Sequence, residues 1–264
     1  MLKKRIISAL VALFVLAVVL FVLPVIAARF FIGILILAAA WEWAAFLFEK
    51  DKPALRFTYV AFIALLIGIL AMNLPSAALT SGILTAALAW WFVALVWIFL
   101  FPTPVPKPVA WLCGALVLVP AWLALDILYL RSPELLLFAL LIVWVADIGA
   151  YFVGRGFGRV KLAPQISPGK TWEGVFGGLC AVLLLAALSS DYLQIRISVL
   201  LPFCIAVAML SVVGDLTVSM FKRSAGLKDS GTLFPGHGGL LDRIDSVTAA
   251  APLFALALSW MGLK

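Results

Sequence analysis

The chain has 264 residues, of which 66% are hydrophobic and only 12% are charged. Soluble domains carry about 25% charged residues, so this composition excludes an ordinary soluble protein and indicates an integral membrane protein. Apolar runs of about 20 residues recur along the chain, which predicts spanning helices rather than a β-barrel. The net charge of +7 is better explained by cytoplasmic loops that face anionic lipid than by nucleic-acid binding.

Nine apolar runs predict an all-α polytopic fold with about nine transmembrane helices in a single membrane-embedded domain, residues 1–264. The runs cover approximately residues 6–28, 30–48, 57–72, 77–101, 109–130, 135–153, 175–188, 197–214 and 246–263. A basic segment precedes the first run, as in a signal peptide, but the length of that run and the span that directly follows favour a retained helix. Residues 1–133 are expected to form a helical scaffold, and residues 134–264 contain the two long polar segments, 154–173 and 215–245.

The positions of the basic residues predict the orientation of the chain. With the N-terminus in the cytoplasm and the C-terminus in the periplasm, fifteen of the 19 lysines and arginines face the cytoplasm. These are Lys3, Lys4, Arg5, Lys50, Lys52, Arg56, Lys107, Arg155, Arg159, Lys161, Lys170, Lys222, Arg223, Lys228 and Arg243. The far side keeps Arg29, Arg131, Arg196 and Lys264. Both long polar segments then lie in the cytoplasm, so a soluble, charged substrate is expected from that side.

Four acidic residues lie within or beside the apolar runs, where ionisable groups usually face a cavity or a partner. They are Glu42, Asp126, Asp147 and Glu173. Asp147, near the cytoplasmic end of its run, is the strongest candidate for a functional group. Glu42 stands between two tryptophans and fits a functional role and a structural hydrogen bond equally well, whereas the position of Asp126 fits the far membrane interface.

The segment from Asp215 to Asp245 is polar, with eight charged residues among its 31 and the only histidine of the chain, His237. Hydrocarbon cannot accommodate it, so it must lie in water or in a protein-lined cavity. If the preceding helix continues, Asp215 and Ser219 share one face, and Asp242 and Asp245 share another. Two carboxylates from two helix ends suit Mg²⁺, and the lysines, arginines and glycines around them suit phosphate. The alternative is a solvated, salt-bridged surface loop.

The other polar segment contains the sequence SPGKT, which runs from Ser167 and includes Lys170. GKT also occurs in P-loops, but Pro164 stands where that motif requires glycine, and no strand is expected before it. The three glycines at 154, 156 and 158 are poor evidence for a nucleotide-binding fold, but they can form a flexible anion-binding turn. The three cysteines all lie inside apolar runs, which gives no reason to expect a disulfide or a zinc site.

The pattern from Ser219 to Asp245 closely resembles the defining motif of the bacterial phosphatidate cytidylyltransferases, or CDP-diacylglycerol synthases. It reads S-x-x-K-R-x₄-K-D-x-G-x₃-P-G-H-G-G-x-x-D-R-x-D. The resemblance extends to GDL at 214–216, to SPGKTWEG at 167–174 and to ADIGAY at 146–151. Many members of the family have serine or threonine where this chain has Ile148. The first five spans resemble the family only in hydropathy, length and the AAWEW segment at 39–43.

The resemblance implies that the lipid phosphate of phosphatidate attacks the α-phosphorus of CTP, which yields CDP-diacylglycerol and pyrophosphate in phospholipid biosynthesis. It implies that Mg²⁺ is bound by Asp215 and Asp242, and it leaves room for a second cation. The implied catalytic residues are Asp215, Asp242, Lys222, Arg223 and His237. The implied substrate-binding residues are Ser167, Lys170, Ser219, Lys228, Asp229, Arg243, Asp245 and Asp147. The resemblance also implies the bacterial inner membrane, contact with membrane lipids and a homodimer, without nucleic acid.

Other functions compete with this interpretation. A related nucleotidyltransferase that activates a different lipid phosphate would leave the same motif. A transporter or channel would suit nine spans with buried acids, but the charges gather in cytoplasmic segments and no inverted repeat is apparent. A CDP-alcohol phosphotransferase is disfavoured because its motif begins with Asp-Gly, a dipeptide that this chain lacks. A polytopic scaffold without catalysis fits an intact motif poorly.

Overall fold

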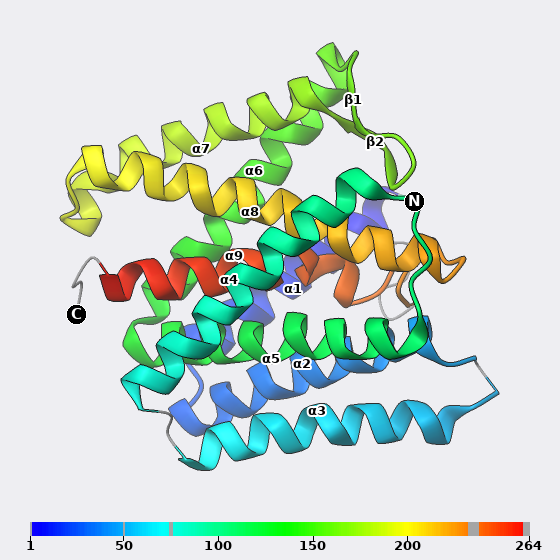
Figure 1. Ribbon diagram of the computed structural model, residues 1–264. Helices are drawn as coiled ribbons and strands as arrows, with labels where there is room; N and C mark the ends of the chain where they lie inside the picture. Colours follow the sequence, from blue (N-terminus) through cyan, green and yellow to red (C-terminus); the bar gives the residue numbers. More distant parts are fainter. Residues whose placement is uncertain (1, 50, 74–75, 232–237, 261–264) are drawn as a thin grey trace.

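A computed structural model describes residues 2–49, 51–73, 76–231 and 238–260, and Figure 1 shows their arrangement. The described residues form a bundle of helices and one two-stranded antiparallel hairpin. The helices are α1 (Leu2–Phe21), α2 (Val25–Leu47), α3 (Pro53–Asn73), α4 (Ala77–Leu100), α5 (Lys107–Arg131), α6 (Pro133–Phe157), α7 (Trp172–Leu193), α8 (Ile197–Ser224) and α9 (Leu241–Trp260), and the strands are β1 (Lys161–Ala163) and β2 (Ser167–Thr171).

Seven helices of the described chain, α2 to α8, are long and apolar enough to cross a membrane, which makes this a polytopic helical membrane protein. Residues Leu10–Phe21 of α1 form a shorter apolar helix. Helix α9 does not reach the same hydropathy, since its first turns carry Asp242, Arg243 and Asp245. The predicted fold class is therefore confirmed for seven spans.

The helix boundaries differ from the predicted ones at several points. The first run ends earlier than expected, because Pro24 has no N–H group to continue a helix and becomes the N-cap residue of α2. Arg29, expected between two spans, consequently lies inside α2. Helix α6 continues to Phe157, so the glycines at 154 and 156 are helical, and a flexible anion-binding turn at this place was a wrong prediction. Helix α8 continues past the apolar run to Ser224, as the shared face of the polar stretch required.

The segment between α6 and α7 contains a hairpin that the sequence did not predict. Strands β1 and β2 pair antiparallel, with Lys161 opposite Thr171 and Ala163 opposite Ser167. The Thr171 hydroxyl caps α7 by accepting the N–H of Gly174 at 3.2 Å. The expectation that no strand precedes GKT is therefore wrong, because this sequence lies in β2 and follows β1.

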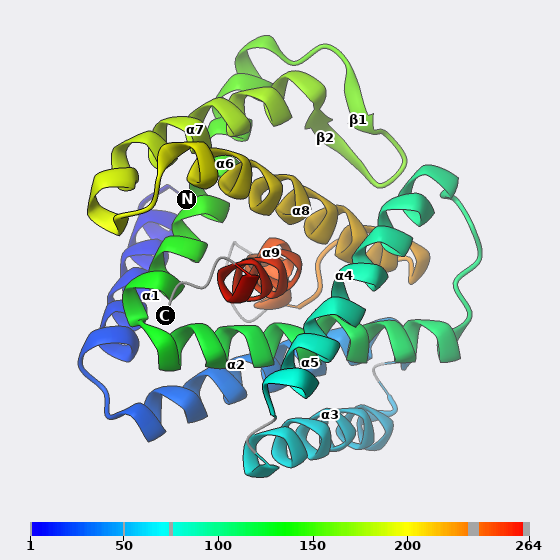
Figure 2. The ribbon, with the colours of Figure 1, turned by 60° about the vertical axis from the view of Figure 1, so that its left-hand side comes forward.

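Helix α9 occupies the middle of the bundle, with α4, α5, α6 and α8 around it (Figure 2). Most of its side chains are buried, and Phe254 packs on Phe203 of α8 with ring centroids 4.8 Å apart. Helices α6 and α7 approach closely through glycines, since a Cβ at Gly178 would lie 2.6 Å from the carbonyl oxygen of Ala146. The surrounding helices thus shield α9 from lipid, which allows its first turns to be polar.

Two polar contacts, one partly and one fully buried, fix α2 against α5. Arg29 forms a bidentate ion pair with Asp126, with N–O distances of 2.7 and 2.8 Å. The Trp43 indole donates a hydrogen bond to the carbonyl oxygen of Ala110 at 3.0 Å. Asp126, whose position fits the far membrane interface, is thus paired with Arg29, which the distribution of basic residues predicts on that same side.

Candidate active site

The extension of α8 beyond its apolar run sets up the first part of the site. Asp215 and Ser219 lie one turn apart on this helix, and the Ser219 hydroxyl donates to Asp215 Oδ1 at 3.2 Å. Lys170, on strand β2, places its Nζ 2.5 Å from Asp215 Oδ2. The structure therefore brings the SPGKT segment to the polar stretch, although the two are separate in the sequence.

A second lysine–carboxylate pair joins α8 to the start of α9. Lys222 Nζ lies 2.6 Å from Asp242 Oδ1, and each side chain is only 10% exposed. Asp242 Oδ2 accepts the backbone N–H groups of Ser230 and Gly239, at 3.0 and 2.9 Å. Both carboxylate oxygens of Asp242 thus accept hydrogen bonds from nitrogen donors, which hold the group in one orientation.

Two further carboxylates lie around Asp215. Asp245 is buried near the start of α9 and interacts electrostatically with Asp215. Asp147, which is exposed on α6, interacts electrostatically with Asp215, Lys170 and Arg243. Carboxylates from two other helices, α6 and α9, and a lysine from the hairpin thus lie near Asp215.

The other predicted site residues that the structure describes lie on the hairpin, on α8 and the segment after it, and on α9. Arg223 donates through Nε to the carbonyl oxygen of Ile166 at 3.2 Å, which ties the end of α8 to the hairpin. Ser167 is partly buried in β2. The residues Lys228, Asp229 and Arg243 are exposed. His237 lies outside the described residues, so its predicted role stays a prediction.

The donor set around Asp215 and Asp242 agrees with a hard cation such as Mg²⁺, since both groups offer carboxylate oxygens. Among the described residues, no group of three or more His, Cys, Asp or Glu side chains is arranged to hold a metal ion by itself. Magnesium sites for phosphate substrates commonly use one or two carboxylates and complete their coordination with substrate oxygens and water. The two carboxylates therefore fit a site that substrate completes, in which a cation would compete with Lys170 and Lys222.

Glu42 is a site-forming residue whose role the sequence left open between function and structure. It is buried, at 7% exposure, and accepts hydrogen bonds from Ser230, Leu240 and Leu241 at 2.7–2.9 Å. The signal in the sequence is a single acid inside an apolar run. Ser230, which sits at an unspecified position of the motif, carried no such signal.

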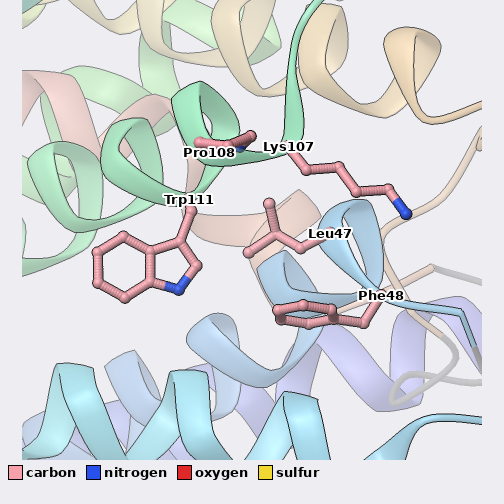
Figure 3. Close-up of a pocket in the computed structure, with 5 residues that line it drawn as sticks. All are labelled: Leu47, Phe48, Lys107, Pro108 and Trp111. Atoms are coloured by element: carbon pink, nitrogen blue, oxygen red, sulfur yellow. The ribbon is translucent and has the colours of Figure 1, made fainter.

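A separate pocket of about 310 Å³ lies between the end of α2 and the start of α5 (Figure 3). Its lining consists of Leu47, Phe48, Lys107, Pro108 and Trp111. This mostly apolar lining suits hydrocarbon better than a triphosphate, and it shares no residue with the carboxylate cluster.

Comparison with known proteins gives matches along nearly the whole chain. The model of the cytidylyltransferase family matches residues 3–261. A Pseudomonas aeruginosa protein named phosphatidate cytidylyltransferase is 44% identical over 269 residues, which cover 98% of this chain and 97% of that protein. The Haemophilus influenzae protein of the same name is 37% identical over 284 residues, 97% of this chain and 98% of its own. A Staphylococcus epidermidis protein of that name is 46% identical over 125 residues, 47% of this chain and 48% of its own.

Proposed function

The chain belongs to the cytidylyltransferase family, and we propose that it transfers the cytidylyl group of CTP to phosphatidate, releasing pyrophosphate and forming CDP-diacylglycerol. The observation that carries this proposal is the pair of lysine–carboxylate contacts, Lys170–Asp215 and Lys222–Asp242, which gather β2, α8 and α9 into one polar site. A site that combines carboxylates, which can hold a metal ion, with lysines, which can bind phosphate oxygens, suits a nucleoside triphosphate with its metal ion.

In the proposed reaction, a phosphate oxygen of phosphatidate forms a bond to the α-phosphorus of CTP, and the bond from that phosphorus to the bridging oxygen of pyrophosphate breaks. The nucleophile is already an anion, so a strong general base is not required. Asp215 and Asp242 would hold Mg²⁺, which supplies charge neutralisation at the phosphate oxygens. Lys170 and Lys222 neutralise the two carboxylates in the free protein and bind phosphate oxygens in the substrate complex.

The remaining predicted groups act as substrate contacts in this proposal. Arg223 orders the hairpin through Ile166 and lies beside Lys222 on the last turn of α8. Asp147 and Asp245 set the electrostatic field around Asp215. The other members of this group are Ser167, Ser219, Lys228, Asp229, His237 and Arg243.

We further propose nine spans, including α1 and α9, in the bacterial inner membrane with a cytoplasmic N-terminus and a periplasmic C-terminus. The basic-residue distribution supports this orientation. In Figure 1 the hairpin and the end of α8 lie on one side of the bundle, and the last turn of α9 lies on the opposite side.

Single-domain organisation, with residues 134–264 as the catalytic half, is supported by the packing of α9 against α4 and α5. The homodimer and a second cation remain predictions from the resemblance.

Labelling of single cysteines in whole cells tests the orientation. A cysteine placed at Lys161 in the hairpin is expected to resist a membrane-impermeant thiol reagent, whereas a cysteine at exposed Tyr192, in the last turn of α7, is expected to react. Each cysteine is introduced into a chain whose three native cysteines are replaced by serine or alanine. The reverse labelling pattern would contradict the orientation and leave the site geometry unaffected.

The activity is tested with detergent-purified protein, phosphatidate, Mg²⁺ and CTP labelled at the α-phosphate, with ATP, GTP and UTP in parallel. Label should enter the lipid phase from CTP, and a chelator should abolish this transfer until Mg²⁺ is restored. Asp242→Asn should lose activity by roughly 100-fold or more, because it removes charge and an acceptor from the centre of the site. Asp191→Asn, at an exposed acid beyond the site, provides the matched control.

Two alternatives are decided by the same protein preparation. Efficient labelling of another lipid phosphate, with poor labelling of phosphatidate, would identify a related nucleotidyltransferase. Transport of a labelled substrate into vesicles without turnover of any nucleotide would favour a transporter.

A further inference from the structure

Glu42 connects the N-terminal half of the chain to the polar stretch of the C-terminal half. Its Oε2 accepts the Ser230 hydroxyl at 2.7 Å and the Leu241 N–H at 2.8 Å, and its Oε1 accepts the Leu240 N–H at 2.9 Å. These partners are 188 to 199 residues away in the sequence. The carboxylate group of Glu42 therefore faces three hydrogen-bond donors, and its oxygens accept from all of them.

The two backbone contacts lie at the beginning of α9. The first N–H groups of a helix have no partner within the helix, and a side-chain oxygen usually satisfies them from the residue just before it. Here the glutamate comes from α2 and accepts the N–H groups of Leu240 and Leu241. A negative charge at this end also interacts favourably with the helix dipole. Glu42 thus fixes where α9 begins.

The same segment fixes the orientation of Asp242. Ser230 donates its hydroxyl to Glu42 and its backbone N–H to Asp242. Gly239 donates its N–H to Asp242, and a Cβ added to it would overlap both Glu42 Oε2 and Ser230 Oγ. Glu42 and Asp242 are therefore held by shared residues, and displacement of one carboxylate moves the groups that orient the other.

The position of Glu42 is itself rigid. Its neighbour Trp43 is fully buried, donates a hydrogen bond to Ala110 on α5 and packs on Phe221 of α8, with ring centroids 5.0 Å apart. The carboxylate is consequently presented from a fixed helix, as a supporting group for a catalytic site should be.

We propose that Glu42 is a positioning residue for the transfer reaction: it holds Ser230 and the start of α9 in place and so fixes Asp242 beside Lys222. This inference rests on the proposed function, in which Asp242 belongs to the catalytic machinery. It assigns a role in the reaction to a residue of the first spans, outside the motif of the C-terminal half.

The test compares Glu42→Gln with the wild type and with Glu49→Gln, which makes the same chemical change at an exposed acid near the end of α2. Glutamine keeps the shape of Glu42 but turns an amide donor toward at least one of the N–H groups. We expect kcat to fall by about 10–100-fold, the typical loss when a supporting group of a metal or catalytic ligand is removed. A higher Mg²⁺ concentration should be needed for half-maximal rate, with a smaller change in KM for CTP. Glu49→Gln should behave as the wild type.

Amide hydrogen exchange provides a readout that does not depend on turnover. In Glu42→Gln, exchange should increase in peptides that cover Gly239 to Asp245 and stay unchanged in peptides of α3 and α7. An unchanged kcat per folded molecule would overturn the proposal. Faster exchange throughout the protein with lower thermal stability and unchanged kcat would also overturn it, because it would show a purely structural role.

Ser230→Ala gives a second, milder perturbation, because it removes one donor to Glu42 and leaves the backbone N–H to Asp242. Its loss of kcat should be smaller than that of Glu42→Gln, and the double variant should lose less than the product of the single effects. If the two substitutions lowered kcat by independent factors that multiply, Glu42 and Ser230 would not act through the same contact on Asp242. If wild-type protein transfers no label from CTP to lipid, the proposed function fails, whereas the exchange comparison still decides whether Glu42 holds this segment.

Discussion

The ion pair between Arg29 and Asp126 is expected to be a large contributor to stability within the bundle. The Asp126 side chain is 6% exposed and the Arg29 side chain 28% exposed, and both N–O contacts are shorter than 3 Å. Arg29→Met would leave the carboxylate buried without its partner, which typically costs about 3–5 kcal/mol. Because Arg29 retains some exposure, the lower figure of roughly 3 kcal/mol is the better expectation. At about 2–4 °C per kcal/mol, it corresponds to a fall of about 6–12 °C in the unfolding midpoint.

Thermal unfolding of the detergent-purified variants measures this effect. Arg196→Met serves as the control, since it removes an exposed arginine at the start of α8 and should change the midpoint little. The double variant Arg29→Met with Asp126→Leu should recover most of the lost stability, because it removes the unpaired charge as well. A midpoint for Arg29→Met within 1–2 °C of the control, or a double variant less stable than the single one, would refute the reasoning.

Two further variants test the hairpin and the helix packing. Lys170→Gln should lower turnover by about 10–100-fold and raise KM for CTP, because it removes the cation that faces Asp215. Lys161→Gln, at an exposed lysine of the same hairpin, should retain both values. Equal effects of the two substitutions would contradict a role for Lys170 in the site. Gly178→Ala should destabilise the protein by about 1–3 kcal/mol, because its Cβ would meet the carbonyl oxygen of Ala146. Gly156→Ala, whose Cβ meets nothing within 4 Å, should leave the stability unchanged. Equal unfolding midpoints for the two variants would show that α6 and α7 pack less closely than in the structure.

The sequence predicted the features that depend on hydrophobic runs and on local spacing. Long apolar runs predicted most of the helices, and the spacing of Asp215 and Ser219 predicted a shared helix face, which the hydrogen bond between them confirms. The motif and the GDL segment before it also place Asp215, Lys222 and Asp242 in one candidate site. Such patterns are readable because they repeat along one element.

Features that depend on contacts between distant elements were not predicted. The hairpin of 161–171 has little alternation of apolar and polar residues. It is held by contacts with α7 and with Arg223, which its own sequence does not reveal. Glu42 gave an ambiguous signal because its partners are two backbone N–H groups and a serine, none of which carries a mark in the sequence. Pro24 marks the break between α1 and α2, but the apolar residues on both sides of it gave the pattern of one continuous span.

The position of α9 explains why the two halves of the chain form one unit. Its first turn carries charge, so it could not face lipid alone without leaving polar groups unsatisfied. Helices α4 and α5 cover it from the N-terminal half, and Glu42 of α2 accepts the N–H groups at its start. The carboxylates that would hold the metal ion therefore owe their geometry to residues from both halves. Residues 134–264 contain the motif and the donors that contact Asp242, whereas residues 1–133 supply Glu42 and the helices that cover α9.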